Sequence, residues 1–548
     1  MAKLFTVFFK TQEAKNNSES RLKQVEDWLK NEYSELEIKV ISNETSSLFI
    51  IGNQKELNLQ LDHGILGFSD SNDWRNNELI PDGNFFIYRT KGNFLQLISD
   101  ATLSRSIYYY GTEDFFVFSS LQIPIIFFKN DFVYDKENTP WFLTSGVQKP
   151  FHSLDVNIKM LPPQKVLTLN LNSFDFVLSS YEIAILNKED NYADFVNVIK
   201  KSFNATLPAN KKAILLSGGI DSRLQLNLID NKDDLTAITW TKELNEVPMT
   251  DLSIAKKIAL KHNLDHKILH LKNADFDVAF ELFLKYSEGR IDMISGYLDG
   301  FQAWNEIEKI KVSALFRGDE AFSLYNGDNF SLVRHRNGIV GINDFETPIA
   351  KYLTEKNHSF SSTKELDNES LNAYAKRLRV NYRLPAILGT LNEIKCFFVE
   401  IYNPLLNNSI VAYSKQLNPN IDYREKYFKK INSEFSIMKY ATKVSIERVD
   451  DYLVKHKKDI ATRLKRIDSK MFAAIGLETD AIRQLMVRMS IPNKPKSKLS
   501  ILKSLLPKKF KKKFLKLKKH NLSDVRLAFR VLLLTETFVK IKTKLDEN

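Results

Sequence analysis

Cysteine is almost absent from the 548-residue sequence, in which Cys396 is the only one. This excludes an intramolecular disulfide and any zinc site built from several thiolates. Long apolar runs are also missing, because even the segment FFVFSSLQIPIIFF carries two Ser, a Gln and a Pro. A membrane-spanning helix needs about 18 to 20 apolar residues, and MAKLFTVFFK reads as a strand, not a signal peptide. We therefore expect a cytoplasmic protein without a membrane span.

Glycine and proline are scarce as well, at 18 and 15 residues. Hydrophobic residues make up 43% of the chain and charged residues 27%, which is the balance of a chain that can bury a core. At about 100 to 200 residues per domain, the length corresponds to roughly three to five domain-sized units. A single small binding module is excluded.

The net charge of +12 comes from one segment. Residues 494–520 contain twelve Lys, no Arg and no acid, so the rest of the chain balances at 67 basic and 67 acidic residues. This distribution does not indicate a nucleic-acid-binding surface. Within the segment, Phe510, Phe514 and Leu517 have helical spacing, which predicts that 508–519 docks on an anionic membrane or an acidic partner. Packing of the stripe on the protein itself is the alternative.

Three regions follow one another along the chain. Residues 1–190 consist mostly of short apolar or alternating runs separated by turn residues, which predicts a β-rich domain. In residues 191–450 short buried strands alternate with helical patterns, which predicts a parallel sheet. Residues 451–548 are predicted to form a helical C-terminal extension. In the second region we expect strands at 213–217, 235–240 and 267–271, and helices from 223–229 and 251–262.

The most informative segment is the loop Ser217-Gly218-Gly219-Ile220-Asp221-Ser222, which follows a predicted strand and precedes a predicted helix. Its glycines let the backbone approach a ligand, its serine hydroxyls can donate, and the helix N-terminus presents free N–H groups. An acid in such a loop would repel a bare phosphate, so Asp221 implies a divalent cation between it and the phosphate oxygens. The loop therefore predicts a site for ATP with Mg²⁺. A tight turn with a serine cap is the structural alternative.

A second acidic loop follows a later predicted strand, in the segment Arg317-Gly318-Asp319-Glu320-Ala321-Phe322. Ligands of open parallel sheets lie at the carboxyl ends of the strands. A second acid at a strand end is what magnesium binding by two carboxylates needs, so Asp319 is a candidate partner of Asp221. A helix N-cap with an acidic first turn is the alternative.

The loop 217–222 resembles the SGGxDS loop of the PP-loop ATP pyrophosphatases, which cleave ATP to AMP and pyrophosphate. The second loop resembles the GDExF element of asparagine synthetase-like proteins. This resemblance implies that Asp319 joins Asp221 in binding magnesium and that Gly318 lies at the phosphates. FFVEIYNPLLN at 397–407 is similar to that family's GxExRxPxLD stretch, with Glu400 on its glutamate. YREKYFKK at 423–430 resembles the helix after which the family has a catalytic lysine. The resemblance implies Lys443, or less directly Lys439, for that role.

The first region resembles the class II glutamine amidotransferase domain of the same family. The resemblance is carried by Gly83-Asn84-Phe85, Asp100, Arg105, Tyr108-Tyr109 and Leu161-Pro162-Pro163-Gln164. Glutamine-dependent members use an N-terminal cysteine, whereas position 2 here is Ala2, so glutaminase activity by that route is excluded. In this respect the chain is similar to β-lactam synthetases and lasso-peptide cyclases, in which an amine is the nucleophile.

A second departure is Phe316, at a position where the resembling enzymes have a glutamate or a tyrosine that handles the amine's proton. Phenylalanine cannot do this. Glu400 or Asp292 could take over the role, the chemistry could differ, or the site could be inactive.

The predicted function is an ATP-dependent amide ligase that adenylates a small-molecule or peptide carboxylate and couples it to an amine or ammonia. Two alternatives remain open: an RNA-modifying enzyme of the lysidine-synthetase type, and a non-catalytic nucleotide-binding scaffold. A homodimer is compatible with the sequence. Free aspartate, a peptide side chain and a polysaccharide uronic acid all remain open as the carboxylate.

Overall fold

The computed structural model describes most of the chain. The described residues are 2–53, 58–76, 79–183, 190–203, 211–243, 245–325, 327–345, 349–355, 360–435, 441, 449–490 and 522–547. Lys439, Lys443 and the lysine-rich segment 494–520, with its predicted docking helix at 508–519, lie outside these residues. Within them, no helix combines the length and the apolar character needed to cross a bilayer.

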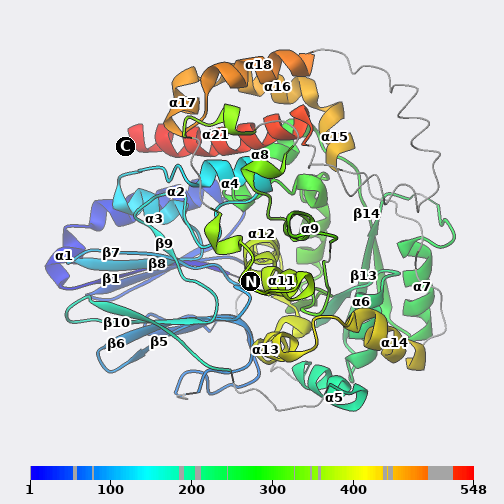
Figure 1. Cartoon of the computed structure of the whole chain (residues 1–548). Helices are drawn as coiled ribbons and strands as arrows, with labels where there is room; N and C mark the ends of the chain where they lie inside the picture. Colours follow the sequence, from blue (N-terminus) through cyan, green and yellow to red (C-terminus); the bar gives the residue numbers. More distant parts are fainter. Residues whose placement is uncertain are drawn as a thin grey trace.

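The first region is rich in β-strands, as predicted, and forms a sandwich of two antiparallel sheets (Figure 1). Phe118 of one sheet lies 6.0 Å from Phe86 and 5.3 Å from Tyr88 of the other, measured between ring centroids, so aromatic side chains fill the space between the sheets. The first sheet has the order β2 (Ile38–Ser42), β3 (Ser46–Ile51), β1 (Lys3–Phe9), β8 (Phe115–Ser119), β7 (Tyr108–Gly111) and β9 (Lys159–Met160). The second has the order β11 (Phe176–Ser180), β10 (Lys165–Asn170), β6 (Phe94–Ser99), β5 (Gly83–Lys91) and β4 (His63–Ser69).

Helices cover the outer face of the first sheet, which the sequence analysis did not predict. All seven residues of β1 are buried, because Phe5 and Phe9 on its outer face pack against Phe128 of α3 (Ile123–Lys129). This region also contains α1 (Gln12–Asn16), α2 (Glu19–Glu32) and α4 (Asn138–Ser145). The run 123–128 is apolar throughout, so its periodicity could not distinguish helix from strand. Its Pro124 stands in the first turn of α3, where proline is tolerated.

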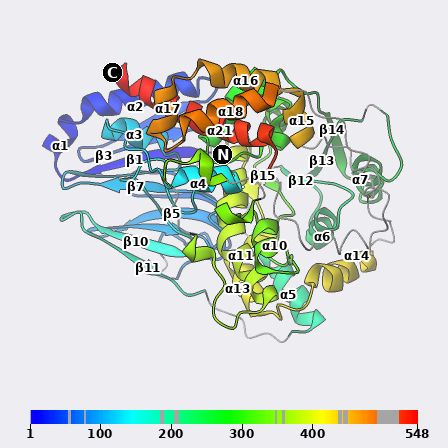
Figure 2. The ribbon, with the colours of Figure 1, turned by 45° about the horizontal axis from the view of Figure 1, so that its top comes forward.

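The second region contains the predicted parallel sheet (Figure 2). The strand order is β14 (Asp265–His270), β13 (Leu235–Thr241), β12 (Lys212–Leu215), β15 (Ala314–Phe316) and β16 (Ile401–Tyr402), and every neighbouring pair is parallel. The connections include α6 (Ile220–Leu228), α7 (Asp251–Lys261), α8 (Phe276–Ser287) and α9 (Gln302–Lys309). The predicted strands and helices are thus confirmed, with bounds shifted by up to three residues.

The chain beyond β15 is mainly helical, and this includes residues 451–548, for which helices were predicted. After α10 (Phe330–Arg336) and α11 (Leu371–Leu378) it continues as the π-helix η5 (Arg379–Gly389) and α12 (Thr390–Lys395). A second π-helical segment, η7 (Arg424–Phe428), leads into α14 (Lys429–Phe435). The other helices named below are α13 (Asn408–Gln416), α15 (Val449–Lys455), α16 (Lys457–Arg466), α17 (Ser469–Ala474), α18 (Thr479–Ser490) and α21 (Asp524–Asp546).

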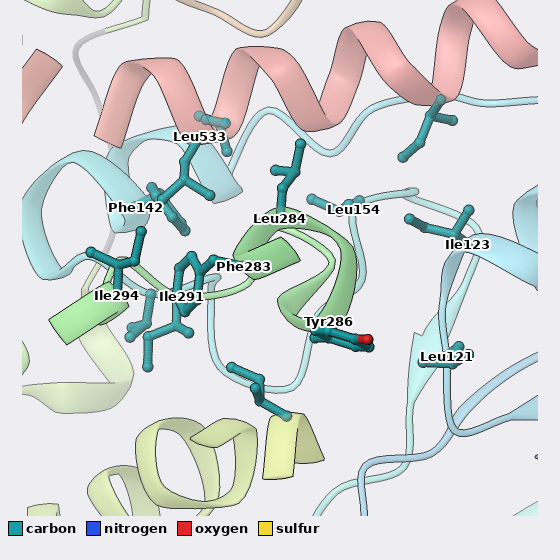
Figure 3. Packing of buried hydrophobic residues seen from close by; sticks show 14 of the residues in the cluster. Leu121, Ile123, Phe142, Leu154, Phe283, Leu284, Tyr286, Ile291, Ile294 and Leu533 are labelled. Carbon is teal, nitrogen blue, oxygen red and sulfur yellow. The ribbon is translucent and has the colours of Figure 1, made fainter. Parts of the chain in front are cut away.

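The C-terminal helix α21 packs across the other two regions (Figures 1 and 2). Its Leu533 points toward Phe142 of α4 and Leu284 of α8 (Figure 3), and all three residues belong to one hydrophobic core. The three predicted regions therefore share a core, and their exact borders stay a prediction.

Candidate functional site

The loop 217–222 connects β12 to α6, with Gly219 at the N-cap of the helix and Asp221 in its first turn. Hydrogen bonds within the loop fix its shape. The Ser217 and Ser222 hydroxyl oxygens are 3.0 Å apart, and the Gly219 N–H donates to Ser217 Oγ over 3.2 Å. The Gly218 N–H donates to Asp251 Oδ1 of α7 over 2.9 Å. The five loop residues predicted to bind phosphate are thus held together at the carboxyl end of β12.

The second predicted loop contacts the first. A Cβ atom on Gly318 would lie 2.9 Å from Asp221 Cβ and 3.4 Å from the Ser222 nitrogen, so only glycine allows the two loops to pack this closely. β12 and β15 are neighbours in the parallel sheet, and their following loops meet at the same sheet edge. The structure therefore brings Asp221 and Gly318-Asp319 together, as the sequence predicted.

Three carboxylates gather at this point: Asp221, Asp319 and Glu320. Burial raises the pKa of Asp221, an effect that Arg424 opposes and the charges of Glu320 and Asp319 reinforce. Burial also acts to raise the pKa of Asp319, but Arg317 and Lys395 bring it below its usual value. Repulsion among the acids is therefore balanced by nearby cations.

Five cationic side chains surround these carboxylates, and the sequence analysis gave none of them a role in the site. Arg424 contacts both oxygens of Asp221, at 2.9 and 2.6 Å, and Arg317 Nε donates to Asp319 Oδ2 over 3.2 Å. Arg379 of η5 donates to Glu320 Oε1 over 3.0 Å. The remaining two act through their charge on Asp319: Arg383 of η5 and Lys395 of α12.

Lys395 is buried and donates to Asn392 Oδ1 over 3.2 Å. Burial, followed by the charge of Arg317, lowers its pKa to about 7. Arg379 and Arg383 stand four residues apart and lie over the Tyr325 ring, at 4.9 and 4.5 Å from its centroid. π-Helical turns are rare and frequently occur at functional sites. The i, i+4 arginines were the one sequence signal for this part of the site.

The carboxylates fit magnesium bound with phosphate better than a metal held by protein alone. Among the described residues, no group of three His, Cys, Asp or Glu side chains is arranged to hold a metal ion. Mg²⁺ is usually bound through one or two carboxylates plus phosphate oxygens and waters. Asp221 and Asp319 can supply those two carboxylates once Arg424 exchanges Asp221 for the phosphates.

Glu400, predicted as a proton acceptor, is engaged elsewhere. Its carboxylate forms a buried ion pair with Arg105, and this pair joins β16 to the sandwich. Burial acts to raise the pKa of Glu400, but Arg105 brings it below its usual value. Phe316 stands among the aromatic rings of Phe203 and Tyr402, 6.5 and 5.5 Å away. The geometry gives no support to a catalytic role for Glu400, which stays a prediction.

Asp292, the other predicted proton acceptor, lies against the C-terminal helix. Arg530 and Arg526 of α21 donate to its Oδ2 over 2.7 and 3.1 Å. A Cβ on Gly146 would lie 2.5 Å from this carboxylate, so the chain passes very close to it. None of these partners belongs to the phosphate loop, and the catalytic role of Asp292 likewise stays a prediction without geometric support.

The predicted lysine, Lys443, lies outside the described residues. The described residue nearest to it in sequence is Ala441, whose backbone N–H donates to the Gly218 carbonyl over 3.2 Å. The chain two residues before Lys443 therefore contacts the phosphate loop.

The residues that resemble an amidotransferase site have structural partners here. The Asp100 carboxylate accepts the Phe85, Thr102 and Ser104 N–H groups. Asn84 Oδ1 accepts the Asn403 N–H over 2.8 Å. Ala2 is buried in the apolar core between the two sheets. Asp100 and Ala2 thus stabilise the sandwich itself, and Asn84 links it to the segment that follows β16.

No protein-family model and no curated protein matches this sequence. Among solved structures, the chain is similar to the NH3-dependent NAD synthetase from Campylobacter jejuni, with 13% identity, a TM-score of 0.17, and coverage of 56% of this chain and 100% of that chain. It is also similar to the glutamine phosphoribosylpyrophosphate amidotransferase from B. subtilis, with 8% identity, a TM-score of 0.19, and coverage of 72% and 92%. Both TM-scores are low, so neither similarity carries an argument about this chain.

Proposed function

We propose that this chain is an ATP-dependent carbon–nitrogen ligase of the asparagine synthetase-like kind. It would join a carboxylate to an amine and release AMP and pyrophosphate. The observation that carries the proposal is the contact between the loop 217–222 and Gly318-Asp319. Two acids and a helix N-terminus meet there among five cations, at the carboxyl edge of a parallel sheet.

The proposed role of each residue follows from its chemical groups. Ser217, Gly218, Gly219, Ser222 and Gly318 would cradle the β- and γ-phosphates with hydroxyl and backbone N–H groups. Magnesium, held by Asp221 and Asp319, would neutralise the pyrophosphate as it leaves.

The cations would stabilise the charge that develops on the phosphates. Arg424 is already positioned at Asp221, and Arg317 and Lys395 at Asp319. Lys443 is proposed to act with them, since the chain at Ala441 contacts the loop. Preorganised cations of this kind favour a transition state in which negative charge is redistributed.

The nitrogen source is proposed to be a free amine or ammonia and not glutamine. Residue 2 is Ala2, which carries no thiol, and apolar side chains pack between the two sheets. The sandwich would then serve as a scaffold that positions β16 through the Arg105–Glu400 pair.

A non-catalytic nucleotide-binding protein is the second candidate. One observation favours it: Asp221 and Glu400, two of the predicted site acids, each form an ion pair with an arginine. Such a protein would bind ATP and release no product.

The two candidates can be separated by following α- and γ-labelled ATP with Mg²⁺, ammonia and, in turn, aspartate, an acidic peptide and a uronic acid. The proposal expects AMP and pyrophosphate with one of the carboxylates, and neither product with Asp221→Asn. ADP and phosphate as products would contradict the proposed chemistry. ATP binding with no product from any carboxylate would favour the scaffold.

A further inference from the structure

The side chain of Arg424 lies against one of the two acids proposed to hold magnesium. Arg424 is the first residue of η7, and its Nε and Nη2 atoms donate to the two carboxylate oxygens of Asp221 over 2.9 and 2.6 Å. This two-pronged contact is the geometry in which a guanidinium binds a carboxylate most strongly. The arginine therefore occupies the same oxygens that a divalent cation would need.

A second carboxylate stands on the other side of the same guanidinium. Glu320 Oε1 lies 3.9 Å from Arg424 Nε, at the outer limit of an ion pair. Glu320 is buried and is held in place by Arg379, whose Nη2 donates to the same oxygen over 3.0 Å. If Arg424 leaves Asp221, Glu320 remains as its counter-ion. The guanidinium thus has two alternative partners within a few ångströms, which is what a two-state contact requires.

The Arg424 side chain can change partner while its backbone stays in place. The preceding residue, Tyr423, is buried, and its hydroxyl accepts the Asn418 N–H over 3.1 Å and donates to Asp190. The Arg424 and Asp221 side chains, in contrast, are both partly exposed. An exposed ion pair typically stabilises a protein by less than about 1 kcal/mol. A competing anion of higher charge is therefore enough to separate the two.

Phosphate is such an anion, and the loop 217–222 would bring it to this place. Asp221 stands in the first turn of α6, where the free N–H groups of a helix bind phosphate. Arginine binds phosphate oxygens with the same fork that it uses for carboxylates. Movement of Arg424 onto phosphate would leave both Asp221 oxygens free, beside the loop that carries Asp319. The acids would then be open to a cation only when phosphate is present.

We propose that Arg424 is a positioning residue that makes divalent-cation binding conditional on a polyphosphate. It neutralises Asp221 until phosphate oxygens take over its guanidinium. The inference rests on the proposed function for the identity of the polyphosphate, which is ATP before the reaction and pyrophosphate after it. When pyrophosphate leaves, Arg424 returns to Asp221 and closes the site to the cation again.

The test measures binding of Mn²⁺ to the full chain by electron paramagnetic resonance, without nucleotide, so the readout does not depend on turnover. Arg424→Gln should bind Mn²⁺ at least ten-fold more tightly than the wild type, because Asp221 loses its competitor. The gain should disappear when Asp221→Asn is added. Arg383→Gln is the matched control, since it removes a charge that acts on Asp319 and frees neither acid. It should change the affinity less than three-fold.

Pyrophosphate, titrated by calorimetry in the presence of EDTA, tests the other side of the exchange. It should bind Arg424→Gln at least ten-fold more weakly than the wild type. Thermal melts confirm folding, and if Arg424→Gln does not fold, Arg424→Lys, which cannot bridge both oxygens, should still gain at least three-fold in Mn²⁺ affinity.

Three results would overturn the proposal: Mn²⁺ affinity that does not rise in the folded variants, an equal rise in Arg383→Gln, or unchanged pyrophosphate binding in Arg424→Gln. Failure of the ligase proposal would look different. In that case the Mn²⁺ and pyrophosphate affinities would shift as expected, and no carboxylate would give AMP.

Discussion

Two clusters of buried charge in this chain are built from the same residue types and differ in their access to solvent. At the phosphate loop, the Arg424 and Asp221 side chains are 33% and 28% exposed. At the seam between the sandwich and β16, Arg105 is 2% and Glu400 10% exposed, and the adjacent Lys3–Glu393 pair is 2% and 4% exposed. The first pair can exchange partners with a ligand, whereas the second is closed. An ion pair alone therefore does not identify a functional acid. The solvent exposure of the pair does, because an exposed pair can exchange partners with a ligand.

The largest effect on activity is expected from Asp221→Asn, which changes the exposed ion pair. Loss of the carboxylate removes one of the two proposed magnesium ligands, so AMP formation should fall by about a thousandfold, equivalent to about 4 kcal/mol. The free energy of unfolding should change little, because Asp221 is partly solvated. AMP release and urea unfolding, measured on the same preparation, check both halves. Activity above a tenth of wild type would argue against the magnesium role.

Glu400→Gln should lower the stability of the fold and leave AMP formation by the folded protein unchanged. Removing one partner of a closed ion pair leaves Arg105 buried and uncompensated, which should destabilise the fold by about 3 kcal/mol. Urea unfolding measures this, with Glu306→Gln in the surface pair with Lys309 as a control that should shift stability by less than about 0.5 kcal/mol. The double change Arg105→Met with Glu400→Met should recover part of the loss. A stable Glu400→Gln protein without AMP formation would instead restore Glu400 as a catalytic residue.

The pH dependence of stability tests Lys395. Its pKa of about 7 in the folded chain lies below the value of 10.5 expected when unfolded, so the unfolded state holds the proton more tightly. Stability should therefore rise with pH between 7 and 10.5, by about 2 kcal/mol from pH 7 to pH 9 for this group. Urea unfolding of the ligand-free protein should show this gain, and Lys395→Met should lack it. An equal gain in stability in Lys395→Met would show that another group causes the pH dependence.

The smallest effect is expected from Ala2→Cys. A thiol at this position would stand in an apolar core between sheets packed with Phe86, Tyr88 and Phe118, with no room for glutamine. We therefore expect no release of glutamate from glutamine, in wild type or variant, in a coupled glutamate dehydrogenase assay. Glutamate release by Ala2→Cys would show that the sandwich retains a glutamine site.

The parts of the site that could be predicted from the sequence are those tied to strand ends. Asp221 and Asp319 follow short buried strands, and neighbouring parallel strands bring their ends together. The cations could not be predicted in the same way. Apart from the i, i+4 spacing of Arg379 and Arg383, no local pattern shows which of the 79 basic residues fold inward. Their placement depends on the path of η5 and α12 across the sheet edge.

The elements of the fold also divide into those that the sequence predicts and those that it does not. The strands with alternating apolar and polar residues, and α7 with its 3.6-residue periodicity, could be predicted from the sequence. In each of these elements one face meets solvent, which produces the pattern. The uniformly apolar α3 was not, since both of its faces are buried. Helix α21 was expected only as part of a helical extension. Its packing against α4, about 380 residues earlier in the chain, depends on long-range contacts that sequence periodicity does not encode.

The most direct test of the difference between the two clusters is exchange of labelled pyrophosphate into ATP, with Mg²⁺ and the carboxylate that supports AMP formation. We predict exchange in the wild type, none in Asp221→Asn, and wild-type exchange per folded molecule in Glu400→Gln. Exchange that survives in Asp221→Asn, or that is lost in folded Glu400→Gln, would contradict the assignment of the open cluster to chemistry and the closed one to structure.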